Sequence, residues 1–179
     1  MATESQQVGG RIDPKAFNAA VTVAVMHSRI HQLLCRTTER PSLREVLPRE
    51  VLSSITPDGE NTLLHLAASV GNLKFVEELL KLNPPLVNAI NAEQDTPLHL
   101  AAQGGFSDVV NALLESKDSG VDVRNKRKET ALFKAYESGN LETVEALFKA
   151  YPPSLLKRTA DKRTCLTVAV NRGDSGNWL

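Results

Sequence analysis

The sequence repeats itself every 34 residues, and this period constrains the fold more than any other feature does. A threonine and a glycine recur at that interval: Thr62, Thr96, Thr130 and Thr164, and Gly71, Gly105, Gly139 and Gly173. A fixed period of this size indicates an array in which each unit packs only against its neighbours. The sequence therefore predicts an elongated stack of similar units rather than a single central core.

Each unit of the repeat has the pattern of two helices joined by a tight turn. In the first unit, apolar residues at helical spacing predict an inner helix over 62–70 and an outer helix over 73–82. Gly71 lies between them, where the turn favours a residue free to adopt positive φ. Proline pairs at 84–85 and 152–153 end two of the outer helices. The predicted fold class is all-α, a solenoid of stacked helix-turn-helix units with short hairpin-like finger loops.

The period also predicts the boundaries of the units. Three full units are flanked by less regular segments: a disordered N-terminus at 1–12, a degenerate N-terminal capping repeat and linker at 13–57, full repeats at 58–91, 92–125 and 126–159, and a truncated fourth repeat at 160–179. In the fourth unit an inner helix is expected over 164–172, and no outer helix follows Gly173. Either Trp178 folds back over the apolar edge left there, or the chain has been cut short.

The second unit reads Thr96-Pro97-Leu98-His99-Leu100-Ala101-Ala102, and this motif resembles that of the ankyrin repeat. The resemblance extends over 58–173 and implies that the imidazoles of the motif join neighbouring finger backbones by hydrogen bonds. The residues assigned to this structural motif are Thr62, His65, Gly71, Thr96, Pro97, His99, Gly105, Thr130, Gly139, Thr164 and Gly173.

The sequence also departs from the ankyrin pattern at several positions. The glycine usually found two residues before the threonine is replaced by Glu60, Gln94, Lys128 and Lys162. The motif histidine is lost in the third and fourth units, where Phe133 and Thr167 stand, and Lys134 replaces a leucine. These departures predict that the third and fourth units are less regular and less stable than the first two.

A narrower resemblance is carried by the segments Ile12-Asp13-Pro14-Lys15-Ala16-Phe17 and Asn83-Pro84-Pro85-Leu86. They are similar to segments of the plant ankyrin proteins of the accelerated-cell-death type. In that family cytoplasmic repeats precede a C-terminal membrane domain named for a Pro-Gly-Gly motif, which is absent from this sequence. The resemblance implies a role in plant defence or stress signalling and membrane anchoring of full-length relatives. The alternative is that the chain is a truncated cytoplasmic fragment of such a membrane-anchored signalling protein.

The composition argues against several classes of function. The chain has 21 basic and 21 acidic residues, so there is no bulk electrostatic case for nucleic acid or an anionic membrane. Cys35 and Cys165 lie far apart in the sequence and predict reduced thiols rather than a disulfide framework. The sequence shows neither a signal-peptide pattern nor an apolar run long enough to span a bilayer. We therefore expect a cytoplasmic location, or the cytoplasmic face of a membrane if a full-length product carries the C-terminal domain.

No pattern in the sequence points to catalysis. The glycines match neither of the phosphate-binding loop motifs, and the serines lack a nucleophile-elbow context. The motif histidines have no further ligands at the spacing of a zinc site. The prediction is a protein that is not an enzyme and that needs no cofactor, metal or small-molecule substrate.

Recognition of a protein partner is the function that remains. In ankyrin arrays the finger tips and the exposed ends of the inner helices form a concave surface. The candidate partner-binding residues are Asp58, Asn61, Ser69, Glu93, Asp95, Gln103, Lys126, Arg127, Glu129, Glu137, Lys162 and Arg163. Early fingers are acidic and late fingers basic, so we expect a partner whose charge runs the opposite way. Solvated finger tips without a partner and a partly folded fragment are the alternatives. Binding of nucleic acid by the basic fingers is not expected, because aromatic residues for base stacking are nearly absent there.

Overall fold

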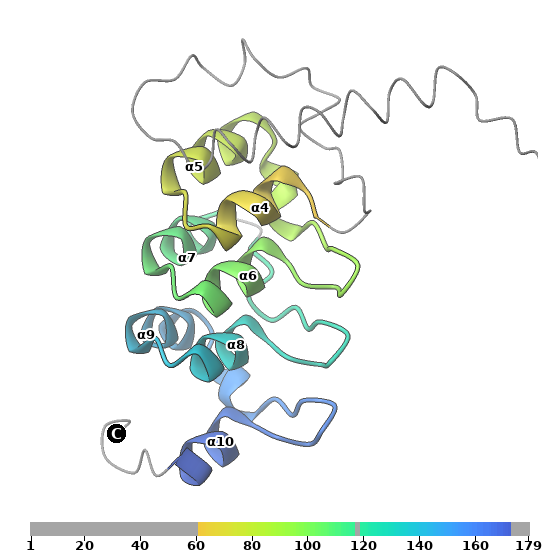
Figure 1. The fold of residues 1–179 in the computed structure, drawn as a ribbon, viewed down its shortest axis with the longest axis vertical. Coiled ribbons are helices and arrows are strands. Elements are labelled where there is room, and N and C mark those ends of the chain that lie inside the picture. Colours follow the sequence, from red (N-terminus) through yellow and green to blue (C-terminus); the bar gives the residue numbers. More distant parts are fainter. Residues whose placement is uncertain (1–60, 117–118, 173–179) are drawn as a thin grey trace, which may run out of the picture.

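The computed structural model describes residues 61–116 and 119–172, and within these ranges the protein is a stack of helix pairs (Figure 1). Inner helices alternate with outer helices along the chain: α4 (Leu63–Ser69), α5 (Leu73–Leu82), α6 (Pro97–Gly104), α7 (Ser107–Leu114), α8 (Ala131–Ser138), α9 (Leu141–Ala150) and α10 (Cys165–Arg172). The inner helices α4, α6, α8 and α10 form one column, and the outer helices α5, α7 and α9 form a second (Figure 1). The predicted all-α solenoid is confirmed.

The recurring threonines set where the inner helices begin. Thr62 precedes α4, where its backbone N–H donates to Nδ1 of His65 (3.2 Å) and its hydroxyl accepts from the His65 N–H (3.4 Å). Two donors that a helix start would otherwise leave unpaired are thus satisfied reciprocally. At α10 a second threonine takes the place of the histidine, because the Thr164 N–H donates to Oγ1 of Thr167 (2.8 Å). The same cap geometry is therefore built with two different partners.

The recurring glycines end the inner helices in the left-handed conformation that the tight turn requires. Gly71, Gly105 and Gly139 have φ angles of 72°, 71° and 78°. A residue with a Cβ adopts this region only at an energetic cost, which explains the glycine at each of these turns. The proline pairs after the outer helices do more than end them, since they start two 3-10 helices, η1 (Pro84–Asn88) and η2 (Pro152–Leu156). The proline pairs by themselves predicted only the ends of the outer helices, not these two 3-10 helices.

The core lies between successive helix pairs and is made of small and aliphatic side chains. Ala67, Ala101 and Ala135 are fully buried on the inner helices, where small side chains let adjacent helices approach closely. Leu79 and Leu113 on the outer helices are also fully buried. Each pair buries its apolar surface against the next, which is why this fold needs no large central core.

The helices of the third unit are as long as helices of the first two, although its departures from the motif predict a less regular unit. Helix α8 has 8 residues, as α6 does, and α9 has 10 residues, as α5 does. The prediction of lower regularity was therefore wrong for the helix lengths of this unit, although its cap lacks the reciprocal bond that His65 and His99 make in the first two units, and lower stability remains a prediction. The physical reason is that Phe133 and Lys134 make other contacts in place of those of the lost residues, as described below.

Several expectations fall outside the described residues. These are the disordered N-terminus at 1–12, the degenerate cap at 13–57, Asp58, Gly173 and Trp178. The inner helix of the fourth unit lies inside the described ranges and is present as α10. Among the helices that the structure describes, none is both long enough and apolar enough to cross a membrane.

Candidate protein-binding surface

Three finger loops, at 91–95, 125–129 and 159–163, project from the inner helices on the same side of the stack (Figure 1). Each is closed by a backbone hydrogen bond from its first N–H to its last carbonyl, with N···O distances of 3.0, 3.0 and 2.8 Å. The residue before the last is left-handed in every finger, with φ of 60° at Gln94, 57° at Lys128 and 61° at Lys162. The fingers thus keep the backbone that glycine favours although the sequence places larger residues there.

Neighbouring fingers are joined to one another through the motif histidines and the backbone. Nε2 of His65 lies 2.9 Å from the carbonyl oxygen of Asp95, and Nε2 of His99 lies 3.2 Å from that of Glu129. Because Nδ1 of each ring accepts from a threonine N–H, the proton is on Nε2, which donates to the carbonyl. The structure therefore contains the links that the ankyrin resemblance implied. Burial lowers the pKa of both imidazoles, which keeps them neutral in this role.

Direct backbone bonds complete the connection between fingers. The Lys126 N–H donates to the carbonyl of Glu93 (3.0 Å), and the Ala160 N–H donates to that of Arg127 (2.7 Å). These bonds, together with the histidine links, hold each finger at a fixed offset from the previous one. The finger tips are therefore presented as one rigid series of loops.

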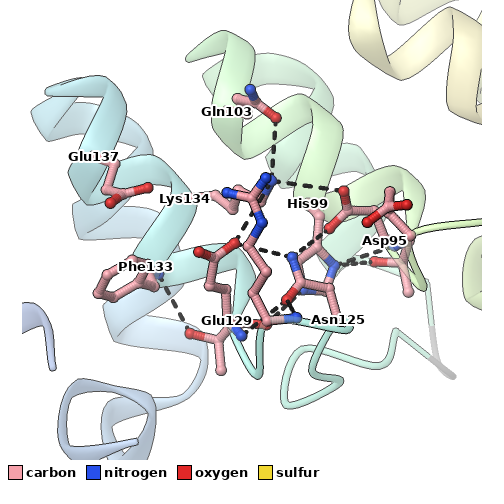
Figure 2. Close-up of polar contacts among 12 residues, drawn as sticks. Asp95, His99, Gln103, Asn125, Glu129, Phe133, Lys134 and Glu137 are labelled. Atoms are coloured by element: carbon pink, nitrogen blue, oxygen red, sulfur yellow. Dashed lines mark hydrogen bonds and ion pairs between the residues drawn. The ribbon is translucent and has the colours of Figure 1, made fainter. Parts of the chain in front are cut away.

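A polar cluster occupies the junction between the fingers at 91–95 and 125–129 and their inner helices (Figure 2). The side-chain amide of Asn125 donates to Oδ1 of Asp95 (2.8 Å) and to Oε2 of Glu129 (3.0 Å). The ammonium of Lys134 lies 3.6 Å from Asp95 Oδ2, 3.8 Å from Glu129 Oε2 and 3.4 Å from Oε1 of Gln103. Two carboxylates thus share one ammonium and one amide.

This cluster corrects two of the predicted partner contacts. Asp95 and Glu129 were expected at the exposed tips, but their exposed fractions are only 6% and 3%. Their carboxylates turn towards Asn125 and Lys134 because a buried charge is stable only when it is paired and hydrogen-bonded. Lys134, which stands where the motif has a leucine, supplies one positive charge that the two carboxylates share. The sequence did contain a signal for this cluster. It is a lysine at a position that is apolar in the other units, one unit after an acidic finger residue.

The finger at 159–163 is attached to the third unit by Arg163 and Phe133. The guanidinium of Arg163 lies 5.3 Å from the centroid of the Phe133 ring, and its Nη1 lies 3.2 Å from Oε1 of Glu137. Phe133 stands where the first two units have the motif histidine, so a cation–π contact replaces the histidine link at this junction. Arg163 and Glu137, both predicted as partner contacts, are partly buried and bind one another.

The remaining predicted contacts are accessible and form two groups. Glu93, Lys126, Arg127 and Lys162 are exposed on the finger loops, and Lys126 and Glu93 form an ion pair of 3.7 Å. Ser69 and Gln103 are exposed at the ends of inner helices, and Asn61 is partly buried beside the Asn91 side chain, whose amide donates to its Oδ1 (3.1 Å). The surface available to a partner therefore consists of charged tips and a more neutral inner wall.

The described residues contain no group of three or more histidine, cysteine, aspartate or glutamate side chains placed to hold a metal ion. Burial raises the pKa of the Cys165 thiol to about 11, so this cysteine is a poor nucleophile at neutral pH. The two motif histidines are occupied by their structural hydrogen bonds.

A helical solenoid with linked finger loops defines a class of repeat proteins that act by binding other proteins. A family model described as ankyrin repeats (3 copies) matches residues 22–126, which is more than half of the chain, and the chain belongs to the ankyrin-repeat family. The structure extends the array beyond that match, because α8, α9 and α10 continue the stack to residue 172. A search of the curated proteins finds no match to this chain.

Proposed function

We propose that the chain is a non-enzymatic scaffold or adaptor that binds a protein partner on the concave face formed by its fingers and inner helices. The observation that carries the proposal is the rigid linkage of the fingers, whose backbones are bonded to one another while their tips carry exposed charged side chains. A surface that is ordered before binding loses little conformational entropy on association, which favours recognition.

The charge order along the fingers supports a partner with a complementary order. Glu93 marks the acidic end of the described fingers, whereas Lys126, Arg127 and Lys162 mark the basic end. Asp95 contributes less to this field than Glu93 does, because it is buried and shares the ammonium of Lys134 with Glu129. Complementary charges of this kind govern the association rate and the register of a complex more than its affinity.

A triple charge reversal tests this proposal. In the full chain, Lys126→Glu, Arg127→Glu and Lys128→Glu together should weaken binding of a partner isolated by affinity capture and reduce the salt dependence of that binding. A matched control reverses three exposed lysines on the outer helices: Lys74→Glu, Lys81→Glu and Lys149→Glu. Unchanged binding in the finger variant contradicts the charge argument. If the partner also binds the Gln103→Arg variant, which changes the inner wall, then the proposal that the partner uses the concave face is wrong.

The resemblance to plant ankyrin proteins of the accelerated-cell-death type supports a more specific role. We propose a cytoplasmic function in plant defence or stress signalling. The second candidate is the cytoplasmic portion of a membrane-anchored ankyrin signalling protein, favoured by the Asn83-Pro84-Pro85-Leu86 segment that resembles those relatives. Sequencing the transcript beyond the codon for Leu179 discriminates the two, because an anchored product requires apolar stretches of about 20 residues.

A further inference from the structure

The fingers retain an excess of positive charge after their internal ion pairs are counted. Glu93 pairs with Lys126 and Asp161 with Arg163, whereas Asp95 and Glu129 share the single ammonium of Lys134, so one buried carboxylate charge stays uncompensated. Arg127, Lys128 and Lys162 are exposed and take part in no ion pair within the described ranges. We refer to these three residues as the surplus cations. An exposed group of charges of one sign is matched best by a ligand of the opposite sign.

Two of the surplus cations occupy positions where a lysine is energetically unfavourable. Lys128 and Lys162 have φ angles of 57° and 61°, and a residue with a Cβ in this region costs about 1 kcal/mol more than glycine. Backbone strain that persists at an exposed position is a reason to look for a function of the side chain. The same position is also left-handed at Gln94, so the strain belongs to all three fingers, and a lysine occupies it in the two adjacent fingers at 125–129 and 159–163.

The spacing of these lysines defines the shape of a matching ligand. Packed helices lie about 8–10 Å apart, so equivalent residues on the fingers of the stacked helices α8 and α10 recur at about that interval. The Ala160–Arg127 backbone bond keeps the two fingers in this relation. A peptide extended in the polyproline II conformation has three residues per turn and advances about 3.1 Å per residue, so side chains three residues apart lie on the same side and are separated by about 9 Å. Acidic residues at every third position of an extended segment therefore match successive finger tips.

We infer that the surplus cations bind an extended acidic segment of the protein partner, which runs along the stack with carboxylates at every third residue opposite Lys128 and Lys162. The inference rests on the proposed function, because it names the chemistry of the partner on the same face. A protein segment fits better than a single-stranded nucleic acid, since the three finger loops contain no aromatic residue on which bases could stack.

Fluorescence anisotropy with two synthetic peptides of equal composition tests the inference. One peptide is an Asp-Gly-Ser repeat, and the other has the same residues with the aspartates adjacent. The full chain should bind the periodic peptide more tightly at low salt. The Lys128→Glu and Lys162→Glu double variant should lose about tenfold in affinity. The control double variant Lys74→Glu and Lys81→Glu, with the same change in charge on α5, should stay within about twofold of the parent chain. Equal binding of the two peptides, or equal losses in the two variants, overturns the inference.

A glycine variant separates binding from folding. Lys128→Gly combined with Lys162→Gly removes the charges and relieves the backbone strain, so its unfolding temperature should rise while peptide binding falls. A variant that is more stable and still binds the periodic peptide as the parent does contradicts the inference. An oligonucleotide of mixed sequence is tested in the same way. If it binds the parent chain more tightly than the peptide does, and the glycine variant loses that binding, the ligand of this surface is nucleic acid and the inference is wrong.

Failure of this inference is distinguishable from failure of the proposed function. A partner whose binding is lost in Gln103→Arg but unchanged by Lys128→Glu and Lys162→Glu overturns the acidic-segment inference and leaves the concave face in use. A partner that binds every one of these variants as well as the parent chain overturns both.

Discussion

Replacing Lys134 with leucine tests whether its ammonium stabilises the buried carboxylates of the polar cluster. The first two units have Leu66 and Leu100 at this position, so the repeat pattern alone predicts that Lys134→Leu stabilises the third unit. The structure predicts the opposite, because the carboxylates of Asp95 and Glu129 would remain buried without the ammonium that faces both of them.

The expected loss is smaller than for a fully buried ion pair. Removing one partner of such a pair costs about 3–5 kcal/mol. Here the N–O distances are 3.6 and 3.8 Å, the Lys134 side chain is 13% exposed, and Asn125 still donates to both carboxylates. Leucine also adds apolar burial worth up to about 1.5 kcal/mol. We therefore expect a net destabilisation of about 2 kcal/mol, which corresponds to a lowering of the unfolding temperature by about 8 °C.

Thermal and urea unfolding of the full chain, followed by circular dichroism, measures this effect. Lys126→Ala is the matched control, because its ion pair with Glu93 is exposed and its removal should change stability by less than about 1 kcal/mol. Adding Asp95→Asn and Glu129→Gln to Lys134→Leu removes the unpaired charges and should recover most of the loss. A Lys134→Leu variant as stable as the parent chain would refute the argument that the ammonium compensates the buried carboxylates.

The remaining predictions concern single buried groups. The hydroxyl of Thr143 is buried without a hydrogen-bond partner, and the second unit has Val109 at the equivalent position, so Thr143→Val should raise the free energy of unfolding by about 1 kcal/mol. Equal or lower stability in denaturant melts would contradict this. Burial lowers the pKa of His65 and His99 in the folded state, so their contribution to stability is complete above the unfolded pKa of about 6.5 and is lost as the pH falls below it. The urea midpoint should therefore decrease from neutral pH to about pH 5.5, and a flat profile would argue against neutral imidazoles. Because the pKa of Cys165 is raised to about 11, iodoacetamide should alkylate it slowly in the native chain and rapidly in denaturant, as peptide mass spectrometry can measure. Fast native alkylation would show that the thiol is accessible.

The finger loops show which features of the site were predictable. Their positions follow from the period, because each lies just before a recurring threonine, and the exposed Lys126, Arg127 and Lys162 were identified on that basis. The phase of the repeat places a residue on a finger, but it does not say which way its side chain turns. Asp95 and Glu129 occupy the same finger position in adjacent units, and both turn inward.

What the sequence by itself determined is the architecture of this ankyrin-repeat protein. The threonine caps and the glycine turns act within a few residues of their own position, so local stereochemistry sets the start and end of each inner helix wherever the pattern recurs. The tertiary structure alone decided the charge of the surface that a partner meets. Asn125 reaches the carboxylate of Asp95, 30 residues away, only when two units are stacked. Because such contacts depend on packing between units, only the assembled stack shows which charges are neutralised and which remain at the finger tips.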